Sequence, residues 1–311
     1  MIDKKLESLR CLLSGFKSAL IAYSGGGDSV LLAYVANEVL AERSLAVIAD
    51  SASLPRRELT EALAIADTFK IPIRIIKTAE FSSSEYTSNP LNRCYFCKHE
   101  LFTELIPIAK ELGFPVIAYG ENASDVGDYR PGAQAAAEFN IRAPLKEVGL
   151  TKAEVRELSA RFGLPTSNKP QMACLSSRVP HGERVTEQKL QMIEAAENYL
   201  RDNGFHDVRV RHHELPSQPA LATPMTSPHL VHQAVTFNQP ALARIEVGVS
   251  ELSRLDDAAL CTRILAALKQ LGYASVTFDP QGYRRGGAND LTKPSNGWTG
   301  VQSLAIRQDH P

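Results

Sequence analysis

Residues 18–34 read SALIAYSGGGDSVLLAY, and this stretch sets the fold at the start of the chain. An apolar run at 18–24 ends in three consecutive glycines, and 28–40 then shows the apolar spacing of a helix. A short, continuously apolar strand is typical of a parallel sheet that is covered on both faces. A glycine turn between such a strand and a helix presents backbone N–H groups at the positive end of the helix dipole. The stretch therefore predicts a strand, an anion-binding loop and a helix.

The first half of the chain repeats this alternation. Further strands are expected at 45–50, 71–78 and 115–120, and further helices at 3–13, 55–69 and 98–112. Strands that alternate with helices from residue 18 to about 165 predict an α/β fold with a doubly wound parallel sheet. We expect a first domain over 1–165.

The pattern of alternating strands and helices ends at about residue 166. Thr186 is expected to cap a helix that runs to about Asn203, and later elements are predicted as strands at 207–212, 241–247 and 274–279 with a helix at 256–271. This order predicts a smaller α+β domain over 166–290. The Pro-, Ser- and Thr-rich segment 214–240 is predicted to be a surface insertion, and 291–311 a tail.

Composition narrows the class of protein. The chain has 311 residues, of which 44% are apolar and 22% charged, which is ordinary for a soluble globular protein. Its formal net charge of −1 gives no sign of a nucleic-acid partner. The N-terminus lacks a signal-peptide pattern, and no apolar run approaches the roughly 20 residues of a membrane span. We therefore expect a cytoplasmic protein without a membrane partner.

The glycine loop reads S-G-G-G-D-S at 24–29 and lacks the G-K-[ST] of a Walker loop. Its hydroxyls can donate to phosphate, and Asp28 can hold a Mg²⁺ that bridges phosphates. The alternative is a turn that only joins strand to helix. The motif resembles the PP-loop of ATP pyrophosphatases, which cleave ATP to AMP and pyrophosphate. The resemblance implies ATP and Mg²⁺ as ligands of Ser24, Gly25, Gly26, Gly27, Asp28 and Ser29.

Polar residues also follow two of the other expected strands. Ligand contacts in a doubly wound sheet gather beyond the carboxyl ends of strands. The ATP site is therefore expected to include Asp50, Ser51, Gly120, Asn122 and Asp125. Further along, Asp128 is a candidate for metal or substrate and Arg130 for a phosphate. A solvated polar loop is the alternative for each of these residues.

Cysteine spacing raises a separate question. Cys94 and Cys97 form a C-x-x-C, which suits a redox pair, half of a zinc site or part of an iron–sulfur site. Cys174 lies in a polar loop beside Arg178, and nearby basic residues favour a thiolate. A closed zinc site needs four ligands, and only His99 is at hand. Three cysteines suit a [4Fe–4S] cluster with one open iron, and a plain dithiol pair stays open.

The two remaining cysteines have a simpler interpretation. Cys11 and Cys261 fall within helical patterns and are expected to be small core residues.

Nine segments together, in order over roughly residues 3–290, resemble the LarE family of ATP-dependent sacrificial sulfur transferases. They are S-G-G-G-D-S, DSASLPRRE (50–58), NPLNRCYFCK (89–98), GENASDVGDYRPG (120–132), RAPLKEVGLTKAEVR (142–156), MACLSSRVPHG (172–182), VRVRHH (208–213), LARIEV (242–247) and GYRRGGAND (282–290). The likeness breaks at 214–240, where the family usually passes almost directly from one strand to the next.

This resemblance implies a reaction. LarE-type enzymes adenylylate a carboxylate of pyridinium-3,5-biscarboxylic acid mononucleotide and convert it to a thiocarboxylate, for the nickel-pincer nucleotide cofactor. In the sacrificial type the cysteine at the position of Cys174 loses its sulfur. A second type of the family adds a C-x-x-C and holds a [4Fe–4S] cluster. This chain resembles the second type through Cys94 and Cys97.

Roles for other side chains follow from the same likeness. The catalytic candidates are Cys174, Asp28, Glu183 and Glu246. Arg209 and Arg211 alternate on one predicted strand and suit a substrate phosphate; the substrate-binding candidates are Arg130, Ser177, Arg178, Arg209 and Arg211. The expected partners are a small-molecule nucleotide, enzymes of the same cofactor pathway and further copies of the chain. The alternatives are a tRNA thiolase, an amide synthetase related to NAD synthetase, and a nucleotide-binding protein without turnover.

Overall fold

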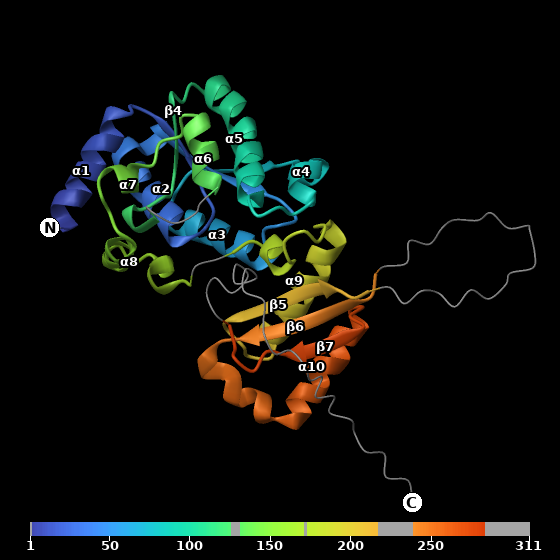
Figure 1. Cartoon of the computed structure of the whole chain (residues 1–311). Helices are drawn as coiled ribbons and strands as arrows, with labels where there is room; N and C mark the ends of the chain where they lie inside the picture. Colours follow the sequence, from blue (N-terminus) through green and yellow to red (C-terminus); the bar gives the residue numbers. More distant parts are fainter. Residues whose placement is uncertain (1, 126–130, 171–172, 217–238, 284–311) are drawn as a thin grey trace, which may run out of the picture.

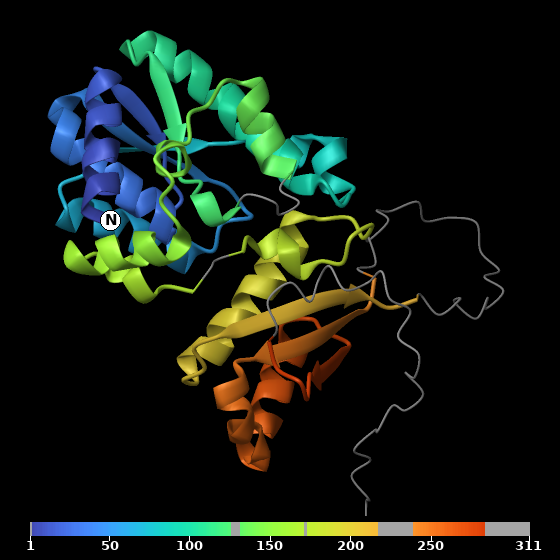
Figure 2. The same ribbon diagram turned by 60° about the vertical axis from the view of Figure 1, so that its left-hand side comes forward.

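The computed structural model describes residues 2–125, 131–170, 173–216 and 239–283. Figure 1 shows two parts: a parallel sheet between helices, drawn in blue to green, and a smaller sheet with its own helices, drawn in yellow to red. Figure 2 shows the same two parts after a turn, with the green-yellow segment passing from one to the other.

The first sheet has four strands, all parallel, in the order β3-β2-β1-β4. Its strands are β1 (Ala19–Ala22), β2 (Ser44–Asp50), β3 (Ile73–Lys77) and β4 (Val116–Tyr119). Four helices contribute to the apolar core on one face: α1 (Ile2–Gly15), α2 (Gly27–Leu40), α3 (Arg56–Thr68) and α8 (Lys152–Arg161). Two cover the other face: α5 (Arg93–Leu112) and α6 (Pro131–Glu138). The predicted doubly wound α/β sheet is confirmed.

This strand order fixes where the switch point of the sheet lies. The chain runs from β1 outward to β2 and β3 and then returns to β4 on the other side of β1. The helices that follow β1 and β4 therefore cover opposite faces of the sheet, and such a switch point is where doubly wound sheets commonly bind ligands. The glycine loop lies directly after β1, so the fold places it at this switch point.

The second sheet has the order β5-β6-β7, antiparallel between β5 and β6 and parallel between β6 and β7. Its strands are β5 (Val208–Glu214), β6 (Ala241–Val247) and β7 (Ser275–Phe278), and α9 (Glu187–Asp202) and α10 (Ala258–Gln270) share one apolar core with it. The Thr186 hydroxyl accepts from the Lys189 N–H, so the predicted cap is confirmed. A division into domains at 165/166 stays a prediction.

Short helices complete the described chain. They are α4 (Ser84–Thr87), α7 (Pro144–Glu147), η1 (Ala41–Arg43), η2 (Glu80–Ser82), η3 (Ala123–Asp125), η4 (Pro165–Asn168), η5 (Leu175–Arg178) and η6 (Val249–Asp256). Most of the predicted insertion and the whole predicted tail lie outside the described residues. The two flanks of the insertion meet, because the Leu215 N–H donates to the Pro240 carbonyl at 2.7 Å.

Two expectations about cysteine-containing helices are wrong. The helix predicted at 98–112 begins at Arg93, so Cys94 and Cys97 lie in its first turns rather than before it. The Arg93 N–H donates to the Pro90 carbonyl at 3.0 Å, which starts the helical turn that early. Cys11 is exposed, because α1 buries Leu9 and Leu13 instead. Cys261 is half-buried, and its thiol donates to the Leu255 carbonyl at 3.2 Å.

Candidate functional site

The glycine loop is shaped by its own serines. Gly25 has φ +71°, and a Cβ there would lie 2.6 Å from the Cβ of Ala62, so only glycine suits the position. The Ser24 and Ser29 hydroxyls lie 3.0 Å apart, and the Ser29 hydroxyl donates to the Gly26 carbonyl at 3.0 Å. The loop is therefore held against the start of α2, whose first N–H groups are the donors that an anion needs.

Asp28 lies on the first turn of α2. One carboxylate oxygen, Oδ2, accepts from Lys152 Nζ at 2.7 Å, while Oδ1 is buried without a hydrogen-bond partner among the described residues. A buried carboxylate oxygen without a partner costs folding free energy, and such an oxygen is a suitable ligand for a hard cation such as Mg²⁺. The residues here thus fit the Mg²⁺ that the sequence predicts, with Lys152 as an adjacent cation.

The fourth strand closes tightly on this loop. A Cβ on Gly120 would lie 2.6 Å from the backbone nitrogen of Ser29, so the chain after β4 touches the start of α2. Asn122 is buried and its amide donates to Asp125 Oδ2 at 3.1 Å. Of these three predicted residues, Gly120 touches the start of α2 directly, and Asn122 and Asp125 bond to each other just after it. Arg130 and Asp128 lie outside the described residues.

The segment after β2 also contributes to the candidate site. The Arg56 guanidinium pairs with the Asp50 carboxylate and donates to the Ser51 carbonyl at 2.6 Å. The Ser51 and Ser53 hydroxyls lie 2.7 Å apart. Ser53 also accepts, through its carbonyl, the Leu175 N–H at 2.8 Å. Cys174 is therefore one residue from a direct backbone contact with the predicted ATP-binding segment.

The cysteine loop is enclosed by residues 86–93. The Tyr86 hydroxyl lies 2.7 Å from the Ser176 hydroxyl, and Arg93 donates to the Ser176 carbonyl at 3.0 Å. Asn89, fully buried at φ +57°, donates through its amide to the Pro180 carbonyl at 2.6 Å. The segment leads into α5, so these contacts bring the C-x-x-C beside the loop of Cys174.

Electrostatic interactions among the three thiols help to shift the pKa values of Cys94 and Cys97. Burial raises the pKa of Cys97, and negative charge on Cys174, Glu80 and Cys94 raises it further. Desolvation also raises the pKa of the Cys94 thiol, with Cys174 adding to it, while Arg93 acts in the opposite direction. Among the described residues, no group of three or more Cys, His, Asp or Glu side chains could hold a metal ion. The thiols are therefore near enough to influence one another but do not form a metal site as they stand.

Arg178 holds the loop of Cys174 through hydrogen bonds. Its guanidinium donates to Glu197 from Nε at 2.8 Å and to the Cys174 carbonyl at 3.0 Å. The side chain of Arg178 is 3% exposed and that of Glu197 is fully buried. Arg178 is therefore already bonded to protein, and its position controls the backbone at Cys174.

The second sheet presents two more arginines to the same loop. Arg211 donates to the Ser177 carbonyl at 2.8 Å and pairs with Glu246 at 3.0 Å. Arg209, on the same face of β5, stacks on the ring of Tyr283 at 4.7 Å. Burial lowers the pKa of Arg209, and the charge of Arg178 lowers it further. Three guanidinium groups thus lie near the cysteine loop, and each has a carboxylate partner: Glu197 for Arg178, Glu246 for Arg211 and, at 3.5 Å, Asp207 for Arg209.

Glu183 is placed differently from the other catalytic candidates. Its carboxylate accepts the Glu214 N–H at 3.1 Å, at the far end of β5 from Arg209. Burial raises the pKa of Glu183, and Lys189 acts in the opposite direction. The contact ties Glu183 to the strand end from which the predicted insertion leaves.

Three residues in this region had not been singled out from the sequence. Lys152 pairs with Asp28, Glu197 holds Arg178, and Glu80 lies between Ser53 and Cys97. A usable signal existed for Glu80, because it follows the third strand of a sheet whose other strands all supply predicted site residues.

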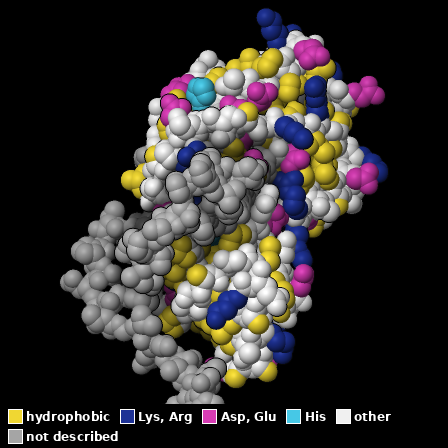
Figure 3. Space-filling model, turned by 90° about the vertical axis from the view of Figure 1, so that its right-hand side faces the viewer, with side chains coloured by type: hydrophobic (Ala, Val, Ile, Leu, Met, Phe, Trp, Pro, Cys, Tyr) yellow, Lys and Arg dark blue, Asp and Glu magenta, His cyan; other side chains and the backbone are white. Residues whose placement is uncertain are grey.

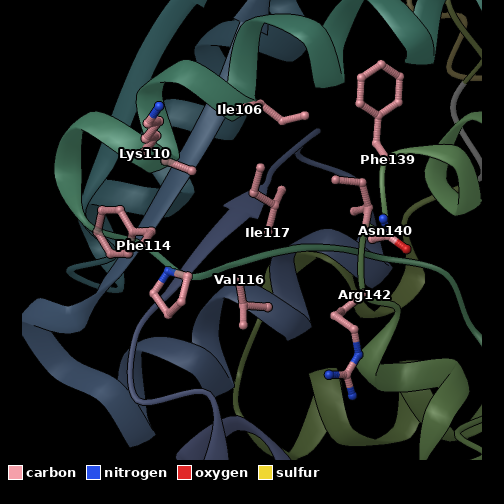
Figure 4. Close-up of a pocket in the computed structure, with 11 residues that line it drawn as sticks. Ile106, Lys110, Phe114, Val116, Ile117, Phe139, Asn140 and Arg142 are labelled. Atoms are coloured by element: carbon pink, nitrogen blue, oxygen red, sulfur yellow. The ribbon is translucent and has the colours of Figure 1, made fainter.

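Other surfaces carry less chemistry. A hollow of about 420 Å³ lies at the amino end of β4, between Phe114 and Arg142 (Figure 4), away from the glycine loop. Figure 3 shows basic and acidic side chains interspersed on the face it presents. Among the helices described, none combines the length and apolar character that a bilayer crossing requires.

Comparison with known proteins agrees with this geometry. Residues 4–93 match the family described as NAD synthase. The chain is 40% identical over 294 residues to the uncharacterized protein slr1717 of Synechocystis, covering 94% of this chain and 100% of the relative. It is 30% identical over 291 residues to the pyridinium-3,5-bisthiocarboxylic acid mononucleotide synthase of Lactiplantibacillus plantarum, covering 93% and 95%. A Methanocaldococcus jannaschii protein, MJ0830, is 28% identical over 195 residues, 63% of this chain and 74% of its own. The chain therefore belongs to the LarE family of the PP-loop superfamily, the family of the Lactiplantibacillus synthase.

Proposed function

We propose that this protein is an ATP-dependent sulfur transferase that converts a carboxylate of pyridinium-3,5-biscarboxylic acid mononucleotide into a thiocarboxylate, for nickel-pincer nucleotide cofactor biosynthesis. The observation that carries the proposal is the 2.8 Å hydrogen bond from the Leu175 N–H to the Ser53 carbonyl. It joins the loop of Cys174 to the segment after β2, at the edge of the sheet where the glycine loop lies.

The first step belongs to the glycine loop. A substrate carboxylate oxygen attacks the α-phosphate of ATP, and pyrophosphate leaves, so that an acyl-adenylate forms. The N–H groups at the start of α2 and the Lys152 ammonium stabilise negative charge that develops on the phosphates. Asp28, whose Oδ1 has no partner within the described chain, would hold the Mg²⁺ that neutralises phosphate charge.

The second step belongs to the cysteine loop. A sulfur nucleophile attacks the acyl carbon, and AMP leaves with the bonding electron pair. Carboxylate is a poor electrophile, which is why ATP must be spent first. Residues 86–93 and Arg178 fix the Cys174 backbone, so the sulfur is held rather than mobile.

Cys94, Cys97 and Cys174 would hold a [4Fe–4S] cluster in this proposal. Three thiols, one in the loop and two on the first turns of α5, are the donor set that suits a [4Fe–4S] cluster with one open iron. When bound, the cluster would supply the sulfur that is transferred. Burial and the charge of Cys174 raise the pKa of Cys94, and Arg93 and Lys98 act in the opposite direction. Binding of iron would therefore have to release the thiol proton.

The substrate carries a phosphate and two carboxylates. Arg209 and Arg211 lie on the face of β5 that meets the cysteine loop, and their planar guanidinium groups match phosphate geometry. Glu246 orients Arg211 for this contact. The protein is expected to work as a homo-oligomer alongside enzymes of the same pathway.

The test is anaerobic reconstitution of five cysteine-to-alanine variants. Pyrophosphate release and thiocarboxylate formation are measured with the pyridinium substrate, together with iron and sulfide content. Cys94→Ala, Cys97→Ala and Cys174→Ala should retain pyrophosphate release and lose both iron and sulfur transfer. Cys11→Ala and Cys261→Ala are the matched controls and should resemble wild type.

Two results would contradict the proposal at different levels. Absence of substrate-dependent pyrophosphate release in the wild type would remove the reaction itself. Full single-turnover transfer by Cys94→Ala without iron, with spent protein lighter by the mass of H₂S at Cys174, would replace the cluster by sacrificial donation.

A further inference from the structure

Glu80 is a buried carboxylate without adequate partners. Its side chain belongs to η2 and the residue is 2% exposed. Oε1 accepts from the Ser53 hydroxyl at a long 3.4 Å, and Oε2 is buried with no hydrogen-bond partner among the described residues. A buried carboxylate costs several kcal/mol unless donors or a cation compensate it. The position therefore calls for a positively charged ligand.

The place of Glu80 shows which ligand is at hand. Glu80 follows β3 at the carboxyl edge of the sheet, and η2 packs against α5, whose first turns carry Cys94 and Cys97. On its other side, Ser53 binds Glu80 through its hydroxyl and Leu175 through its carbonyl. Glu80 thus lies between the C-x-x-C helix and the loop of Cys174.

Apolar packing supports this placement. Leu175 and Val179 pack with Ala52 and Phe81, so the cysteine loop and the residue after Glu80 share one apolar cluster. The carboxylate is therefore held beside the thiols by packing as well as by a hydrogen bond.

We propose that Glu80 is the fourth protein ligand of the metal centre held by Cys94, Cys97 and Cys174. Its carboxylate binds the iron that the three thiolates leave open, and an incoming sulfur ligand displaces it without a change of oxidation state. The inference rests on the proposed function for the identity of the centre. Iron accepts carboxylate oxygen as a ligand, and the ligand set then satisfies a carboxylate that the protein alone leaves uncompensated.

A purely structural role predicts something else. A carboxylic acid kept for a hydrogen bond to Ser53 would use one oxygen and would be replaced by glutamine at little cost. The ligand role requires a carboxylate, because glutamine keeps the shape and the hydrogen bond but not the charge. Glu80→Gln therefore separates the two roles.

The test uses the full chain as wild type, Glu80→Gln, Glu80→Asp and, as control, Glu85→Gln. Glu85 is exposed and lies five residues further along the same segment. After anaerobic reconstitution, each cluster is oxidised gently to its three-iron form, and Fe²⁺ is titrated back while electron paramagnetic resonance follows the three-iron signal. Glu80→Gln should bind the returning Fe²⁺ about tenfold or more weakly than wild type, as expected when a metal site loses a supporting group.

Each outcome decides one point. Glu85→Gln should match wild type, and Glu80→Asp, which keeps the charge on a shorter stem, should fall between and serves if Glu80→Gln fails to fold. If Glu80→Gln binds Fe²⁺ as tightly as wild type, Glu80 is not a ligand of the cluster, and the proposed cluster itself is not contradicted. A wild-type chain that takes up no iron overturns both the cluster and its fourth ligand, whereas retained sulfur transfer would leave the reaction itself in place.

Discussion

Replacing Glu197 by alanine should destabilise the protein by about 4 kcal/mol, because the change leaves a buried positive charge without its partner. The Glu197 side chain is fully buried and accepts from Arg178 at 2.8 and 3.2 Å, from Arg201 at 3.0 Å and from the Val210 N–H at 3.1 Å. Burial alone would raise the pKa of Glu197, yet the charges of Arg178 and Arg201 hold it below its ordinary value. Removing one partner of such a pair typically costs 3–5 kcal/mol.

The partners differ in what they can do after the change. Arg201 is 22% exposed and can turn to solvent, whereas Arg178 is 3% exposed and cannot. The Val210 N–H would lose its acceptor, which adds about 1–3 kcal/mol if water does not enter. Most of the predicted loss therefore comes from Arg178.

The assay is chemical unfolding of single and paired variants at neutral pH. Arg178→Met with Glu197→Leu removes both charges, so the double variant should lose less than the sum of its single variants by about 2 kcal/mol. Glu187→Gln, an exposed change in the first turn of the same helix, should stay within about 1 kcal/mol of wild type. A loss below about 1 kcal/mol in Glu197→Ala, or strict additivity in the double variant, would refute the reasoning.

Three further predictions concern single residues. Gly25→Ala should abolish pyrophosphate release, because its Cβ would meet Ala62 at 2.6 Å. The control Gly163→Ala, at φ +69° with open space around it, should cost only about 1–2 kcal/mol of folding free energy. Equal behaviour of the two variants in pyrophosphate release and in unfolding would contradict this. Asp28→Asn should lower pyrophosphate release at least about tenfold through loss of the metal contact, and unchanged release would remove Asp28 from the step. Burial lowers the pKa of His212 from 6.5 to about 4, so its neutral form stabilises the fold fully above pH 6.5, and roughly 3 kcal/mol should be lost as the pH falls to 4. Unfolding of His212→Gln at both ends of that range should show a shallower acid loss than wild type.

Local pattern was enough to place most of the fold. The apolar runs around residues 18–24 and 45–50 became neighbouring parallel strands, because a buried strand needs continuous apolar side chains. Thr186 was readable as a cap because its hydroxyl acts within three residues. The start of α5 was misjudged at residue 98, since the sequence at 89–97 lacks apolar helical spacing and its turn depends on Pro90 and Asn92.

The placement of the candidate site residues was easiest to predict where they are neighbours in sequence. Ser24 to Ser29 form one loop, because a strand ends in glycine there and a helix begins. Lys152 reaches Asp28 from 124 residues away, and Arg178 reaches Glu197 across two elements. Neither pair leaves a periodic signal, because a single charged side chain on a helix is more commonly a solvated one. Their partners are decided by packing.

Cys11 shows the reverse error. A small residue in an amphipathic helix was expected in the core, but α1 had already filled its inner face with leucines, so the cysteine turned outward. Cys174 was identified for a different reason, which is the polar loop around it. Chemistry-bearing residues are easier to find in loops, because loop side chains are seldom needed for packing.

In the proposed reaction, the contacts around Cys174 would hold the sulfur-transfer step close to the ATP-dependent step. Lys169, five residues before it, pairs with Glu58 and Glu61 of α3 at 2.8 and 2.9 Å and lies 3.5 Å from the Gly25 carbonyl. Leu175, one residue after it, is bonded to the segment that follows β2. The sulfur-bearing loop is thus tied on both sides to elements that surround the phosphate loop. An acyl-adenylate is reactive toward water, so a sulfur held at the same edge of the sheet can reach it before it is lost. Loosening either tie, without touching a thiol, should therefore uncouple ATP consumption from sulfur transfer.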